Sequence, residues 1–118
     1  MTNSRAKGAR GEREWAKYLR GLGYETARRG QQYSGSPDSP DVAEGIPGTH
    51  PEVKRVERLN IHDAMNQAIV DGGDNVVPYV AHKRNRGEWL VTLRADDLRQ
   101  FAALLFDQEL SHKIRNED

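Results

Sequence analysis

The chain has 118 residues, of which 36% are hydrophobic and 31% charged, and its formal net charge is zero. This length suits one domain, so we expect a single domain over residues 1–118. The absence of cysteine excludes disulfides and thiolate metal sites. No run of about 18 apolar residues occurs, so we expect a soluble, cytoplasmic protein with no membrane partner.

Charged residues are distributed unevenly along the chain. Residues 1–36 hold eight Lys or Arg against three Glu, whereas residues 95–118 hold three Lys or Arg against six Asp or Glu. A basic face with an acidic back is typical of a protein that binds a polyanion. An ordinary solvated surface explains the same distribution equally well, so charge alone leaves both interpretations open.

The first half of the chain predicts one helix and three strands. Apolar residues from Trp15 to Leu22 follow helical spacing and predict a helix over residues 8–22. Three short strands are predicted to follow, at 24–28, 41–43 and 51–56. Gly, Ser and Pro are frequent in residues 30–40, which predicts a mobile loop there.

The second half predicts a helix, a hairpin and a last helix. Asn60 is a predicted N-cap, and Gly72 ends the helix that begins there. The hairpin strands occupy residues 79–82 and 88–93, and a polar, frayed tail begins at about residue 111. This order predicts an α/β fold with a mixed five-stranded sheet flanked by helices.

Glu12 interrupts the apolar stripe of the first helix. At about 100° per residue, it projects between Trp15 and Leu19, at the centre of that stripe. A buried carboxylate is costly unless a metal ion or an arginine compensates its charge. A salt bridge near the helix start is the simpler alternative, since the helix dipole favours an acid there.

Asp41, Glu52 and Lys54 form a second pattern. Glu52 and Lys54 are two residues apart on a strand, so their side chains share one face. Asp41 comes eleven residues earlier than Glu52, on an expected neighbouring strand. Three carboxylates that converge from one helix and two strands can hold Mg²⁺. Such an ion activates water and neutralises phosphate charge, and a nearby lysine stabilises the charge that develops.

Four segments together resemble the archaeal-type Holliday junction resolvases and their phage relatives, which belong to the PD-(D/E)XK nuclease superfamily. They are KGARGERE at 7–14, GLGYETAR at 21–28, PDVAEG at 40–45 and PEVKR at 51–55. The resemblance covers about residues 7–95. It implies a restriction-endonuclease-like core and a homodimer that cuts branched DNA, with a phage-infected cell as one setting.

The resemblance also implies roles for individual residues. The implied catalytic residues are Glu12, Asp41, Glu52, Lys54 and Gln67. The implied ligands of Mg²⁺, for which Mn²⁺ can substitute, are Glu12, Asp41, Glu52 and Val53. Arg13 and Arg28 are implied DNA contacts, to which the basic clusters add Lys7, Arg10, Arg29, Arg55, Lys83, Arg84 and Arg86. No small-molecule cofactor is expected.

The chain departs from the family in the loop over 30–40, which is longer than in the compact archaeal enzymes. This loop contains a second acid, Asp38, so that PDSPD offers two candidates for the motif aspartate. We prefer Asp41, because the Val-Ala pair that follows it can form a strand.

Two other patterns have plain structural explanations. The histidines show no metal-ligand spacing, and we expect them at the surface or in turns; they are His50, His62, His82 and His112. Val76–Val80 is apolar on both faces, which predicts either a buried core strand or a dimer contact. The last helix is the other candidate for a dimer contact.

Three functions remain open at the level of sequence. The first is a nuclease that resolves four-way junctions as a two-fold dimer, with one site in each copy. The second is a nicking or restriction-like nuclease. The third is a catalytically silent DNA-binding module of the same fold. The intact set of three acids and one lysine favours an enzyme.

Overall fold

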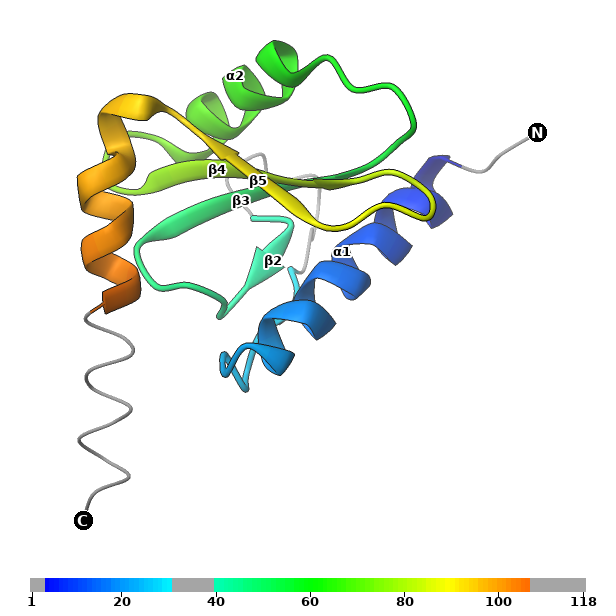
Figure 1. Ribbon diagram of the computed structural model, residues 1–118, viewed down its shortest axis with the longest axis horizontal. Helices are drawn as coiled ribbons and strands as arrows, with labels where there is room; N and C mark the ends of the chain where they lie inside the picture. Colours follow the sequence, from blue (N-terminus) through cyan, green and yellow to red (C-terminus); the bar gives the residue numbers. More distant parts are fainter. Residues whose placement is uncertain (1–3, 31–39, 107–118) are drawn as a thin grey trace.

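A computed structural model describes residues 4–30 and 40–106, with side chains from residue 8 onward (Figure 1). The predicted loop, including Asp38, and the predicted frayed tail therefore lie outside the described residues, apart from the loop's two end residues. In the part of the chain that is described, no helix is long and apolar enough to cross a bilayer.

Two small sheets and three helices make up an α/β arrangement. In chain order, the helices and strands are α1 (Ser4–Gly21), β1 (Arg28–Arg29), β2 (Val42–Ala43), β3 (Thr49–Arg55), α2 (Ile61–Gly72), β4 (Val77–Lys83) and β5 (Leu90–Leu93). A 3-10 turn, Ala95–Asp97, leads into the third helix, which is described from 98 to 106 and drawn in orange in Figure 1.

Five strands are present, but the prediction of one five-stranded sheet was wrong. β3, β4 and β5 form one sheet in that order, with β3 parallel to β4 and β5 antiparallel to β4. β1 and β2 form a separate antiparallel pair of two residues each. The Asp41 carboxylate, not a strand backbone, accepts the Val53 N–H at 2.8 Å, and so a side chain occupies this edge of β3.

α1 and α2 cover opposite faces of the three-stranded sheet (Figure 1). Tyr79 of β4 packs in one core with Trp15 of α1, and the Trp15 indole N–H donates to the Tyr79 hydroxyl at 3.0 Å. Val80 packs in a second core with Ala64 and Ala68 of α2. Because successive strand residues point to opposite faces, the sheet is covered on both sides.

Local predictions were confirmed where side-chain periodicity determines them. Trp15 and Leu19 are buried in α1, but Leu22 is 60% exposed because the helix ends before it. The Asn60 side chain accepts the Asp63 N–H at 3.1 Å, so the predicted N-cap of α2 is confirmed. Val77–Val80 is buried within the fold, which confirms the core-strand explanation of that apolar run.

Candidate active site

Asp41 is held at the edge of β3 by two backbone contacts. Its carboxylate accepts the Val53 N–H, and its carbonyl accepts the Gly30 N–H at 2.8 Å. A Cβ atom on Gly30 would overlap the carbonyl oxygen of Pro40. Glycine at position 30 therefore permits the close chain crossing that brings Asp41 to β3.

Glu52 and Lys54 point to the α2 side of the sheet. Glu52 is in register with Val80, which packs against α2. The Lys54 ammonium nitrogen lies 3.3 Å from Glu52 Oε1 and donates to Gln67 Oε1 of α2, also at 3.3 Å. The structure thus brings these three predicted residues together, and the shared face of Glu52 and Lys54 is confirmed.

Glu12 approaches from the opposite side of the sheet, on α1. It is buried, as its place in the apolar stripe predicted. Arg29 of β1 compensates its charge, with Nε 2.7 Å from Glu12 Oε2. The partner of this buried acid is therefore an arginine distant in sequence rather than a residue near the helix start.

Burial and like charge raise the pKa of Asp41 from 3.8 to about 7. Desolvation is the largest cause, followed by the charge of Glu52; the charge of Glu12 also raises it. The Val53 N–H and the charge of Lys54 act in the opposite direction. All four predicted site residues thus share one electrostatic environment, in which Asp41 is half protonated near neutral pH.

Burial also raises the pKa of Glu52, against the opposing charge and hydrogen bond of Lys54. The charge of Asp71 on α2 raises this pKa further, and a hydrogen bond with Asp41 lowers it. Asp41 and Glu52 therefore titrate as a pair. A positive charge placed beside this pair would stabilise its ionised form.

As placed, the described residues contain no group of three or more acidic or histidine side chains that could hold a metal ion. The carboxylates of Asp41 and Glu52 are the two in direct contact, and Glu12 contacts Arg29. Val53 presents only its backbone to the site, because its side chain is buried in the core beneath α1.

The predicted DNA contacts differ in what they already bind. Arg28 pairs with Glu44 at 2.7 Å and Arg10 with Glu14 at 3.7 Å. Arg55 is largely buried: its guanidinium contacts Glu14 at 3.0 Å and also reaches the Lys83 carbonyl and Asn85. The exposed predicted contacts outside these pairs are Arg13, Arg84 and Arg86, with Lys83 half-buried. The structure does not describe the Lys7 side chain.

One histidine prediction was wrong. His50 is 6% exposed, because β3 begins at Thr49 and so includes it. His82 is partly buried and its ring contacts the Thr92 hydroxyl at 2.9 Å, whereas His62 is exposed. His112 lies outside the described residues. The earlier start of β3 was not visible in the sequence, because Thr49 and His50 follow a turn-like GIPG segment.

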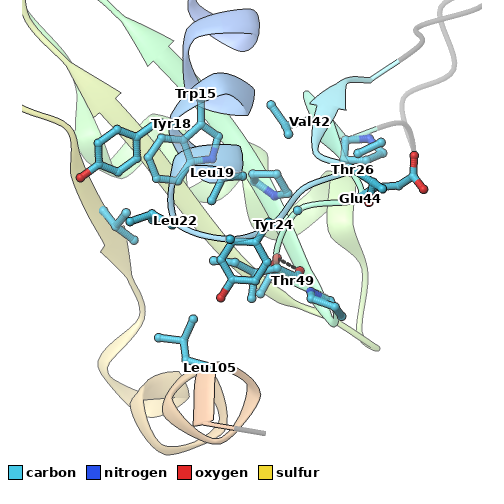
Figure 2. A pocket seen from close by; sticks show the side chains of 18 of the residues that line it. Trp15, Tyr18, Leu19, Leu22, Tyr24, Thr26, Val42, Glu44, Thr49 and Leu105 are labelled. Carbon is cyan, nitrogen blue, oxygen red and sulfur yellow. Dashed lines mark hydrogen bonds between the residues drawn. The ribbon is translucent and has the colours of Figure 1, made fainter. Parts of the chain in front are cut away.

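A groove of about 1230 Å³ lies among α1, β2 and the third helix (Figure 2). Its walls include Trp15 and Leu19 of α1, Val42 of β2 and Leu105 of the third helix. None of the four acidic or lysine site residues lines it. The groove and the carboxylates are thus separate features, although Pro40 and Val42, the chain neighbours of Asp41, line the groove. Sequence reasoning did not predict the groove, since it is formed by side chains from distant segments.

Comparison with protein-family models, with curated proteins and with solved structures found no match.

Proposed function

We propose that the protein is a metal-dependent DNA endonuclease with a restriction-endonuclease-like core. The observation that supports this most strongly is the contact between two buried acids, Asp41 and Glu52, at the edge of β3, with Lys54 beside Glu52. Buried like charges destabilise a fold that has no bound counter-ion, and carboxylates with strongly shifted pKa values cluster at functional sites. Glu12, buried on the adjacent helix, adds a third carboxylate to the same field.

The donor set suits Mg²⁺ or Mn²⁺. Asp41, Glu52 and Glu12 offer carboxylate oxygens and Val53 a carbonyl oxygen, which are the ligand types that these ions prefer. A divalent ion would also relieve the repulsion that raises the pKa of Asp41. When bound, it supplies activation of water and neutralisation of phosphate charge.

The chain's own residues have separable tasks in this proposal. The Val53 N–H fixes the Asp41 carboxylate, so its orientation does not depend on a ligand. Lys54 bridges Glu52 and Gln67 and can donate to an attacking water or to the phosphate oxygen on which charge develops. Gln67 orients the lysine from α2, as a positioning residue.

Selectivity for four-way junctions rests on the resemblance of KGARGERE, PDVAEG and PEVKR to junction resolvases. A junction needs two cuts on opposite strands, and a two-fold dimer would present two sites. The surface available for such a dimer includes exposed Leu90 and Val91 on the free edge of β5 and exposed Leu98 and Phe106 on the third helix. A β-edge with apolar side chains is suited to pairing with a second copy.

The test is a cleavage assay with Mg²⁺ on a four-way junction and on a linear duplex that contains the same arms. Paired cuts in the junction alone are expected. Cuts in both substrates would indicate a nicking or restriction-like nuclease. Binding without cleavage would indicate a catalytically silent DNA-binding module. Light scattering at micromolar protein gives the mass in parallel; a mass near 13.3 kDa for the free protein, and one copy of the chain per junction in the complex, would contradict the dimer.

A further inference from the structure

We infer that Arg29 exchanges partners: it holds Glu12 when the site is free of metal and binds a DNA phosphate when a divalent ion is bound. This inference rests on the proposed function and assigns to one residue a link between metal binding and DNA binding.

The ion pair between Arg29 and Glu12 is unequal in burial. The Glu12 side chain is 11% exposed, whereas that of Arg29 is 43% exposed, and the two lie 2.7 Å apart. A buried carboxylate needs a cationic or hydrogen-bonding partner. An exposed guanidinium can leave without a large change in its own solvation. Glu12 is therefore the fixed member of the pair and Arg29 the member that can move.

Arg29 lies next to the acidic site because of the β1–β2 pairing. It is opposite Val42, and the next residue, Gly30, bonds to the Asp41 carbonyl. A divalent ion that binds Glu12 and Asp41 would compete with Arg29 for the same carboxylate. The released guanidinium would then be at the site where a phosphate is expected, and guanidinium groups bind phosphate well.

The charge balance agrees with this exchange. Two cations, Arg29 and Lys54, face four carboxylates, those of Glu12, Asp41, Glu52 and Asp71, which leaves two negative charges when all four acids are ionised. One divalent ion neutralises these two charges. The site would thus repel a phosphate until the metal has bound.

Arg28 provides a matched control on the same strand. It also pairs with a glutamate at 2.7 Å, but both partners are about half exposed, at 51% for Arg28 and 52% for Glu44. Glu44 does not contribute to the raised pKa of Asp41 or Glu52. Removing Arg28 therefore removes an equal charge close by without freeing a carboxylate of the acidic site.

The first experiment titrates Mn²⁺ into wild type, Arg29→Gln and Arg28→Gln without DNA, by isothermal titration calorimetry. Arg29→Gln should bind Mn²⁺ about 3- to 10-fold more tightly than wild type, and Arg28→Gln within about 2-fold of it. Equal shifts in both variants, or none in Arg29→Gln, would overturn the exchange while leaving the proposed function intact. A wild type that binds no Mn²⁺ would overturn both.

The second experiment measures affinity for a junction in Ca²⁺ and in EDTA. The affinity of Arg29→Gln for the junction should be about 5-fold lower than that of wild type with Ca²⁺, and less than about 2-fold lower in EDTA. The reason is that the wild-type guanidinium is available to DNA only when metal is bound. Equal losses in both conditions would contradict the inference. If Arg29→Gln is too unstable without metal for calorimetry, the increase of its melting temperature on addition of Mn²⁺ is measured instead. That increase must exceed the increase seen with wild type.

Discussion

The two polar clusters on β3 have opposite electrostatic characters. At the Asp41 edge, buried like charges lie together and raise the pKa values of two acids. At the end of the strand, Arg55 is surrounded by complementary groups, since it bonds to Glu14, to the Lys83 carbonyl and to Asn85. The first arrangement weakens the fold and the second strengthens it. Under the proposed function, the first cluster serves the reaction and the second serves the stability of the fold.

The largest expected effect is the loss of cleavage in Asp41→Asn and Glu52→Gln. Each should reduce the Mg²⁺-dependent rate by about three orders of magnitude or more, because each removes a charged oxygen ligand. DNA binding should remain. Asp74→Asn, at an exposed acid, is the control and should cut normally. Full cleavage by either site variant would defeat the assignment of the acidic cluster.

Lys54→Ala should lose cleavage by about 100-fold to 1000-fold while Mn²⁺ binding is retained, because in the proposed mechanism the lysine acts on the reacting oxygen and not on the metal. Single-turnover rates and calorimetry give the two quantities. The control is Lys17→Ala, at an exposed lysine on α1. If metal binding is lost as well, Lys54 has a structural role in the cluster.

Stability without divalent ions should fall as pH rises from about 4 to about 7. The folded state holds the Asp41 proton up to about pH 7, whereas the unfolded chain releases it near 3.8. The free energy of unfolding should therefore decrease by on the order of 2–4 kcal/mol across this window. The lowered pKa of His82 acts in the opposite direction.

Urea unfolding of wild type and Asp41→Asn at pH 5 and pH 8 tests this sign. Because both proteins contain His82, the difference between their slopes reports the titration of Asp41 together with its effect on Glu52. The variant should be more stable than wild type at pH 8, and by a clearly smaller margin at pH 5. If wild type instead gains stability relative to the variant as pH rises, the ionised Asp41 carboxylate does not destabilise the folded state.

Arg55→Ala tests the opposite cluster and should reduce the free energy of unfolding by about 1–3 kcal/mol, since Glu14 and a backbone carbonyl lose their donor. Arg58→Ala, at an exposed arginine three residues later, should change it by less than about 0.5 kcal/mol. Chemical denaturation measures both. Equal, small effects would show that the complementary cluster does not stabilise the fold.

The smallest effects are expected for single exposed arginines. Arg13→Ala and Arg84→Ala should each weaken DNA binding a few-fold and reduce the salt slope by about 0.9, the value for one phosphate contact. Arg94→Ala is the control, because Arg94 pairs with Asp97 within the 3-10 turn. The assay is a salt series of fluorescence anisotropy measurements. An unchanged slope would remove that arginine from the predicted DNA face.

Features set by local periodicity were predictable from the sequence. The burial of Glu12 followed from the helical stripe, and the common face of Glu52 and Lys54 followed from strand alternation. The N-cap at Asn60 followed from its side-chain chemistry. Each of these needs only residues a few positions apart, and the structure agrees with all of them.

Features set by long-range contacts were not predictable. Arg29 reaches Glu12 across 17 positions, and Arg55 reaches Glu14 across 41. The division into two sheets depends on the Asp41 side chain occupying an edge where a strand was expected. A single sequence carries no signal for such pairings, because many arginines and acids of this chain are equally suitable partners.

The crossing at Gly30 makes the site independent of the segment that leads to it. The Gly30 N–H binds the Asp41 carbonyl, so the two ends of residues 31–39 are tied together at their base. Doubling the length of a segment closed in this way costs only about 0.6 kcal/mol. A change of chain length between Gly30 and Pro40 should therefore leave Asp41 in place. In engineering terms, this is a position where residues can be inserted without rebuilding the acidic cluster.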